Sequence, residues 1–402
     1  MAKALRRTDA LSNSFSQTRS IHAVWMLRMT LGFVALLGSI IFILGTSWDV
    51  QWHLLIGRDR TLIPPHLMML SGVALSGFAG LAAILIETFW ARRNPQLAQN
   101  STGFADAFHG SLGAYVVGFA ALNSAIAFPL DAYWHSLYGI DVSIWAPFHI
   151  MIILGMGIVA LGAAYMLMSA TNLAVSAGVQ RMQRVGYTGV VVAFAVVLCA
   201  LTFFLIEASS SSHFIHLGFI TISVFMFLPA LIGAWTLVSV KSALPWRWSA
   251  TTVVLLYYLF AIIVDLYVPR ATGLLMLTEG LSLRPSYQGV AGVAILTFDW
   301  PLLPILAALV VDIVTRYAQK RSWSVKRLLL TEATVALIGF IPLTIFNPTV
   351  ILKAPSRLGI VGFIVSLLLG WGGSLLGAWL GQRTGTALQQ VESPVVQQVE
   401  EA

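Results

Sequence analysis

Long apolar stretches separated by short polar segments dominate the pattern of hydrophobic and polar positions along this chain. Ten stretches hold enough consecutive apolar residues to cross about 30 Å of hydrocarbon as α-helices. They lie near residues 25–46, 64–88, 109–130, 145–169, 185–206, 215–239, 247–268, 288–315, 327–347 and 358–381. The pattern therefore predicts an all-α fold, a polytopic integral membrane helix bundle with about ten transmembrane helices.

The composition strengthens this prediction. Only 10% of the 402 residues are charged and 58% are hydrophobic, and the mean hydropathy is +0.85. Soluble domains carry about 25% charged residues. The single cysteine, Cys199, excludes an internal disulfide and a thiolate-rich metal cluster.

The formal net charge of +7 would suit a nucleic-acid partner, but membrane topology accounts for it. With an even number of spans and both termini in the cytoplasm, all but six of the 23 lysines and arginines fall on the cytoplasmic side. The exceptions are Arg58, Arg60, Arg270, Arg284, Lys353 and Arg357. This positive-inside bias predicts a multi-pass protein of a bacterial plasma membrane. The predicted partner is the lipid bilayer, and no nucleic-acid partner is expected.

An internal repeat concentrates polar side chains at the extracytoplasmic side of the predicted membrane. The segment WDVQWHLLIGRDRTLIPPH, residues 48–66, aligns with LDAYWHSLYGIDVSIWAPFH, residues 130–149. An aspartate, a tryptophan, a histidine, a glycine and a second aspartate recur at one constant offset, and a Pro-x-His follows in both copies. Each copy connects two apolar stretches, so a whole helical hairpin is repeated.

The spacing within each copy brings three metal-ligating side chains together. Asp49 and His53 are four residues apart and share one face if the first helix continues past the hydrocarbon. Pro64 suits the first turn of the next helix and leaves His66 near that helix start. One carboxylate and two imidazoles then form a metal site with open coordination positions. The second copy offers the same set in Asp131, His135 and His149.

Other readings of these residues stay open. A single histidine at a helix end is commonly an interfacial or hydrogen-bonding residue, and Asp59 and Asp141 suit caps of the turn or acceptors for a ligating imidazole. The tryptophans of both copies suit the aromatic belt of a membrane protein: Trp48, Trp52, Trp134 and Trp145. Duplication of the aspartate and both histidines favours metal binding.

The second half of the chain offers weaker candidates. His213 and His216, three residues apart, would share a helix face near Glu207 and could add a third site or a further ligand. Asp299, within an apolar stretch, suits proton delivery or a structural hydrogen bond. Two other acids are interpreted as interfacial charges: Glu87 and Asp312.

At the repeated residues the chain resembles the C subunit of the particulate methane and ammonia monooxygenases, the copper membrane monooxygenase family. That subunit carries an Asp-x3-His-x12-His copper site, the spacing of Asp49, His53 and His66. It also carries a second site of the form Asn-x3-His-x13-His. This second spacing is reproduced, with aspartate in place of asparagine, by Asp131, His135 and His149. The resemblance covers roughly residues 25–170, under half of the chain.

The resemblance implies a copper monooxygenase or its metal-bearing subunit. It would oxidise a small hydrophobic or ammonia-like substrate with dioxygen at the extracytoplasmic face, together with other subunits or an electron donor. Asp49, His53 and His66 would be the catalytic metal ligands. Ligand type alone leaves iron or zinc as alternatives to copper. The alternative function is a transporter or metal-handling membrane protein, although transporters place their sites near the midplane. A b-type cytochrome would leave both carboxylates without a role.

The predictions divide the chain into four regions. A basic cytoplasmic tail (1–24) precedes the duplicated metal-site region (25–170). The second helical half (171–383) resembles no known family, and the polar tail (384–402) is predicted to be disordered.

Overall fold

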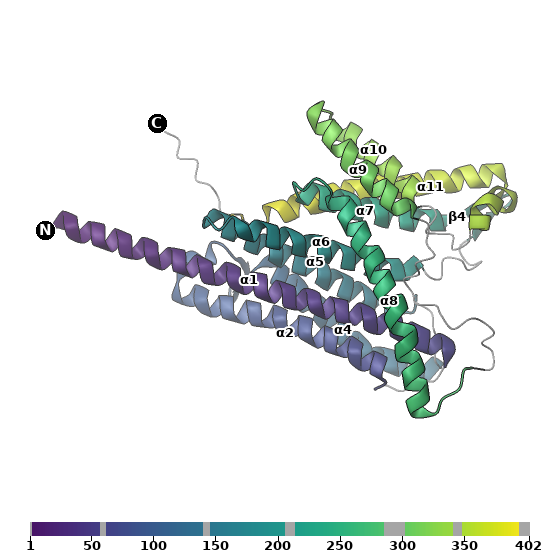
Figure 1. Ribbon diagram of the computed structural model, residues 1–402, viewed down its shortest axis with the longest axis horizontal. Coiled ribbons are helices and arrows are strands. Elements are labelled where there is room, and N and C mark those ends of the chain that lie inside the picture. Colours follow the sequence, from purple (N-terminus) through teal and green to yellow (C-terminus); the bar gives the residue numbers. More distant parts are fainter. Residues whose placement is uncertain are drawn as a thin grey trace.

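The fold is a bundle of α-helices with two short β-hairpins (Figure 1). The computed structural model describes residues 2–56, 62–139, 145–205, 214–284, 302–340 and 348–393. Within these residues, seven helices are long and apolar enough to cross a membrane. They are α1 (Ala2–Leu55), α2 (Pro64–Arg93), α4 (Leu112–Tyr138), α5 (Pro147–Ser176), α6 (Arg181–Thr202), α8 (Ser249–Glu279) and α11 (Pro348–Gln390). The predicted all-α class and multi-pass character are confirmed.

Three helices of the second half are shorter: α7 (Phe227–Ala243), α9 (Leu303–Lys320) and α10 (Val325–Phe340). The latter two begin or end beside segments that lie outside the described residues, 285–301 and 341–347. The predicted spans 288–315 and 327–347 are therefore seen only in part. A single-turn helix, α3 (Pro95–Ala98), and a 3₁₀ turn, η3 (Val224–Met226), complete the helical elements of the described chain.

The predicted helix over residues 215–239 is wrong in its first part. Residues there form an antiparallel hairpin of β3 (Phe214–Leu217) and β4 (Ile220–Ser223), and the helix begins only at Phe227. The turn contains Gly218, whose positive φ of 62° suits a residue without a Cβ. The run Ile-Thr-Ile in β4 is β-branched, which favours a strand over a helix.

Two helical hairpins, α1–α2 and α4–α5, form the unit that carries the sequence repeat. Helix α1 packs against α2 and α5, and α4 packs against α5 and α2. Glycines allow the backbones to approach closely: a Cβ on Gly38 would lie 2.6 Å from the carbonyl oxygen of Gly72, and one on Gly113 would lie 2.4 Å from the backbone nitrogen of Met166. Such small residues are typical of packed membrane helices. The packing places both hairpin connections at the same end of the unit.

The second half of the chain packs around α11. Helix α7 packs extensively against α11, α10 crosses α11, and α8 contacts α1, α6 and α9, so that α8 joins the two halves (Figure 1). Asp312 of α9 is fully buried here, where it pairs with Lys241 at 3.1 Å and accepts a hydrogen bond from the backbone N–H of Thr251. Asp312, interpreted from the sequence as an interfacial charge, is thus a buried and paired carboxylate.

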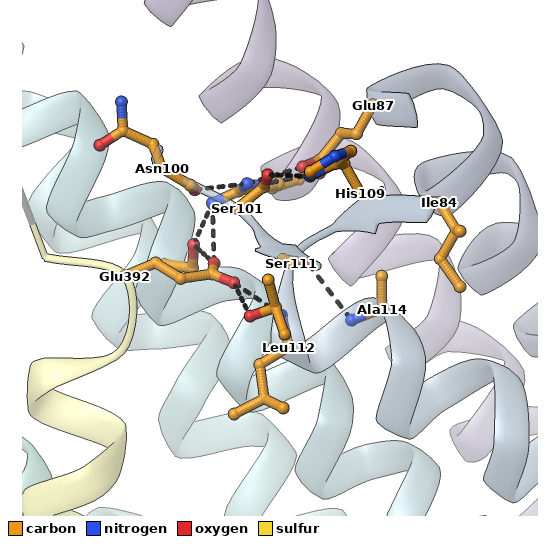
Figure 2. Close-up of polar contacts among 12 residues, drawn as sticks. Ile84, Glu87, Asn100, Ser101, His109, Ser111, Leu112, Ala114 and Glu392 are labelled. Carbon is orange, nitrogen blue, oxygen red and sulfur yellow. Dashed lines mark hydrogen bonds and ion pairs between the residues drawn. The ribbon is translucent and has the colours of Figure 1, made fainter. Parts of the chain in front are cut away.

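Residues 384–393, the described part of the tail predicted to be disordered, have a defined structure, and residues 394–402 lie outside the described residues. Helix α11 continues from the membrane-length stretch to Gln390, so the predicted tail is helical over its first residues. Glu392 then reaches the first turn of α4, where it accepts a hydrogen bond from the backbone N–H of Leu112 at 2.7 Å (Figure 2). A polar composition is compatible with order because this segment gains specific polar partners in the bundle.

The partner that explains this docking is a buried cation. Arg28 of α1 is fully buried and pairs with both oxygens of Glu87, at 2.9 and 2.6 Å, and with Glu392 at 2.8 Å. Ser169 of α5 donates to Glu392 and accepts from Arg28. Glu87, interpreted from the sequence as an interfacial charge, belongs to a buried network that joins three helices and the C-terminal segment.

Candidate metal centre

The first triad forms where α1 ends and α2 begins. Helix α1 runs to Leu55, so Asp49 and His53 share one helix face, and the Nε2 of His53 lies 3.6 Å from Oδ1 of Asp49. Helix α2 begins at Pro64, and the Nε2 of His66 lies 2.9 Å from the same oxygen. The three side chains are 9–16% exposed. The predicted convergence of these residues is thus present in the structure.

The second triad repeats this arrangement where α4 ends and α5 begins. The Nε2 of His135 lies 3.4 Å from Oδ2 of Asp131, and the Nε2 of His149 lies 3.4 Å from Oδ1. The Nδ1 of His135 is 3.1 Å from the carbonyl oxygen of Gly139, which directs the other ring nitrogen towards Asp131. Helix α5 begins at Pro147, the equivalent of Pro64.

The spacing of the donor atoms fits a single metal ion in each triad. In each set, one ligand atom per residue lies within 4.8 Å of the others. Two ligands at about 2.0–2.1 Å from a metal are about 2.9 Å apart at a right angle and about 3.4 Å apart at the tetrahedral angle. The distances of 2.9 to 3.6 Å between imidazole nitrogens and carboxylate oxygens are close to these values. One carboxylate and two imidazoles suit copper, iron or zinc.

The two triads are neighbours rather than isolated sites. They lie at the same end of the packed α1, α2, α4 and α5 unit. His149 of the second triad also contributes to the electrostatic environment of Asp49 in the first. A charge on His149 therefore acts on Asp49 of the first triad.

The end of α1 is fixed from outside by α8 and the segment that follows it. Thr272 donates to the side chain of Gln51 at 2.7 Å. Arg284 donates from its backbone N–H to the carbonyl oxygen of Leu55 at 2.8 Å and from its guanidinium to that of His53 at 3.1 Å. These contacts occupy carbonyl groups at the C-terminus of α1 that have no partner within the helix. They hold the segment that carries Asp49 and His53.

An apolar pocket of about 700 Å³ lies on a neighbouring face of α1. Trp48, the residue before Asp49, lines it together with residues of α8 that include Leu266, Tyr267 and Leu274. Leu266 and Leu274 are 52% and 65% exposed on the apolar surface of a membrane-length helix, so the pocket opens towards lipid. Trp48 itself is buried, and its indole N–H has no hydrogen-bond partner among the described residues. The pocket is therefore open at an apolar surface of the helix bundle.

The structure changes the interpretation of other residues predicted to matter. Trp52 is 1% exposed and packs with Ile63 against α8, so it belongs to the core and not to an aromatic belt. His216 lies in β3, where its Nδ1 is 2.9 Å from the hydroxyl of Thr221. The prediction that His213 and His216 share one face of a helix is therefore wrong, because His216 lies in a strand. Five residues lie outside the described ranges: Asp59, Asp141, Glu207, His213 and Asp299.

Sequence patterns did not indicate the roles of Arg284 and the α8 side of the pocket. Arg284 appears in the sequence as one of the few extracytoplasmic cations, which is the signal that could have marked it. The lining residues of α8 are ordinary apolar residues of a span, and only the packing of α8 on α1 distinguishes them.

No protein-family model, curated protein or solved structure matches this chain.

Proposed function

We propose that the chain is a membrane-embedded metal monooxygenase, or its metal-bearing subunit, with copper as the metal. The observation that carries the proposal is the twofold convergence of one carboxylate and two imidazoles at one end of a four-helix unit. The resemblance of residues 25–170 to the copper membrane monooxygenases supports copper over iron or zinc.

Different residues of such a site would hold the metals and fix the geometry. Asp49, His53 and His66 would hold one metal, and the Asp131 triad would hold a second. A bound copper supplies redox chemistry with dioxygen that the side chains lack. The protein contributes geometry, since the ligands sit on helix ends fixed by Pro64 and by Arg284, and it limits access of water because the ligands are mostly buried.

The surroundings support an apolar substrate that reaches the site through the bilayer. The pocket beside Trp48 is lined mainly by apolar side chains, with Tyr267, Arg270 and Thr278 as its polar members on α8, and it opens at an apolar surface of the bundle. A small hydrophobic substrate would concentrate in the membrane and enter there, and ammonia-like substrates remain within the proposal. The positive-inside bias supports an extracytoplasmic position of both triads in a bacterial plasma membrane. An electron donor or further subunits would complete the reaction.

The transport of a metal or proton is the second candidate function. Its support is a buried polar cluster in the second half: Asp312 pairs with Lys241, and Glu332, which is 2% exposed, accepts a hydrogen bond from Thr315 at 2.7 Å. Ionisable residues buried among membrane helices are characteristic of ion pathways.

The deciding experiment is oxygen incorporation by the purified, reconstituted full-length chain. With copper, a chemical reductant, labelled dioxygen and a small alkane or ammonia, we expect labelled product, and chelation should abolish it. Zinc should not restore activity because it has no redox chemistry. Metal uptake into sealed vesicles without oxygen consumption would favour transport and contradict the monooxygenase proposal.

Filling the pocket gives a second prediction. Leu274→Trp should raise KM for a hydrophobic substrate several-fold without changing metal content, because the added ring occupies space beside Trp48. Leu277→Trp is the matched control, since Leu277 is 82% exposed on the same helix and does not line the pocket. Equal KM values for the two variants would show that substrate does not use this pocket.

A further inference from the structure

A second apolar groove lies on the opposite half of the α2–α4 pair, far along both helices from the triads. It has a volume of about 540 Å³ and is closed at one end by the hairpin of β1 (Thr102–Phe104) and β2 (Phe108–Gly110). Its walls include Leu81, Leu85, Phe104, Phe108, Phe119 and Leu122.

Close packing of small residues creates the floor of this groove. A Cβ on Gly80 would lie 2.9 Å from the backbone nitrogen of Gly118, so the two helices touch there. Gly77 and Ala121 continue the floor, while large side chains such as Phe78 and Phe119 rise on both sides, 71% and 55% exposed. The result is a narrow furrow on a lipid-facing surface rather than a flat helix face.

The dimensions of the groove suit one extended acyl chain. Its α2 lining runs from Val73 to Leu85, which spans about 18 Å at 1.5 Å per residue. One leaflet of the hydrocarbon core is about 15 Å thick. The groove is therefore long enough to hold one acyl chain over the depth of one leaflet.

Two exposed cations stand where a lipid headgroup would lie. Along α2 the groove face continues from Leu85 to Phe89 and then to Arg92 and Arg93, both exposed. The guanidinium carbon of Arg93 lies 3.9 Å from the ring centroid of Phe89. Arg92 donates to the carbonyl oxygen of Ala107 in the turn of the hairpin.

The local charge balance favours an anion. Among the described residues of the β1–β2 hairpin and the end of α2, Asp106 in the hairpin turn carries the exposed carboxylate. Glu87, one turn earlier on α2, is buried and paired with Arg28. His109 lies within hydrogen-bond distance of Ser101 and is the remaining titratable group of the hairpin. Two guanidiniums thus face one exposed carboxylate, at the end of an apolar furrow.

We propose that this groove is a binding site for one anionic phospholipid, with an acyl chain between α2 and α4 and the phosphate at Arg92 and Arg93. The proposal is independent of the metal centre, since no residue of the groove belongs to either triad. Neutral lipids share the acyl chains but not the net charge that the two arginines would select.

Native mass spectrometry of the full-length chain tests this proposal. Nanodiscs would contain phosphatidylglycerol and phosphatidylcholine with identical acyl chains in equal amounts. We expect the wild type to retain one phosphatidylglycerol with about 30-fold preference, the ratio expected for two arginine contacts. In the Arg92→Gln/Arg93→Gln variant this preference should fall to near parity.

Two further variants separate the groove from general surface charge. Arg181→Gln/Arg184→Gln removes two exposed arginines at the start of α6 and should leave the preference unchanged. Gly77→Leu places a side chain in the furrow and should reduce retention of both lipids, with folding checked by thermal unfolding. Equal retention of both lipids by the wild type, or an unchanged preference in the Arg92→Gln/Arg93→Gln variant, would overturn the proposal. A co-purifying protein in place of lipid would also overturn it.

Discussion

Replacing His53 and His66 together with alanine is expected to remove one bound metal per chain. A carboxylate alone, here Asp49, cannot hold a transition metal against water and buffer once both imidazoles are gone. The metal content of the copper-loaded wild type should fall from about two equivalents to about one. The His135→Ala/His149→Ala variant should lose the other equivalent, and the quadruple variant should lose both.

The chain provides matched controls for this prediction. His22 and His216 are exposed and belong to neither triad, so His22→Ala/His216→Ala should keep the full metal content. Elemental analysis of detergent-purified protein after dialysis measures the outcome. Unchanged metal in both triad variants would refute metal binding by the repeat, whatever the activity of the protein.

The neighbouring position of the triads adds a consequence for activity. Because His149 acts electrostatically on Asp49, loss of the second triad should also change the properties of the first. A loss of oxygenase activity in the His135→Ala/His149→Ala variant, with one metal retained, would indicate that both triads serve one reaction. The aspartate at residue 131 matters here because it pairs with His149, the residue of the second triad that acts on Asp49.

The triads could be predicted from the sequence because their geometry is local. Asp49 and His53 are one helical turn apart, and Pro64 marks the start of the helix that presents His66. The one further requirement was that the second helix returns beside the first, and the duplicated pattern indicated that it does. The long apolar stretches were equally clear, since each satisfies its own backbone hydrogen bonds within one helix.

The sequence did not indicate features that depend on distant packing. Arg28 and Glu392 are 364 residues apart, and nothing local shows that they meet. A polar composition predicted disorder for the segment around Glu392, and the bundle supplies partners that composition cannot reveal. The hairpin in residues 214–223 was missed for a different reason, since a short apolar run of β-branched residues is compatible with either a helix or a strand.

The largest effect on stability is expected from Arg28→Met. The substitution keeps an unbranched apolar stem but removes the guanidinium, so the carboxylates of Glu87 and Glu392, 3% and 9% exposed, lose their cation. Removing one partner of a buried ion pair typically costs about 3–5 kcal/mol, because the remaining charge is desolvated and uncompensated. Unfolding in mixed micelles with increasing denaturant would measure this loss.

Neutralising the acids distinguishes a charge effect from lost packing. In the variant Arg28→Met/Glu87→Gln/Glu392→Gln no charge is left unpaired, so much of the stability should return. Arg270→Met is the matched control, because Arg270 is exposed and donates to the carbonyl oxygen of Leu266 in its own helix, so the substitution should cost under about 1 kcal/mol. If Arg28→Met is as mild as Arg270→Met, the network does not hold the C-terminal segment. If the triple variant is as unstable as Arg28→Met, the shape of the site matters more than its charge. The expected order, with Arg28→Met the least stable of the three, would show that α1, α2, α5 and the C-terminal segment are joined through one buried guanidinium.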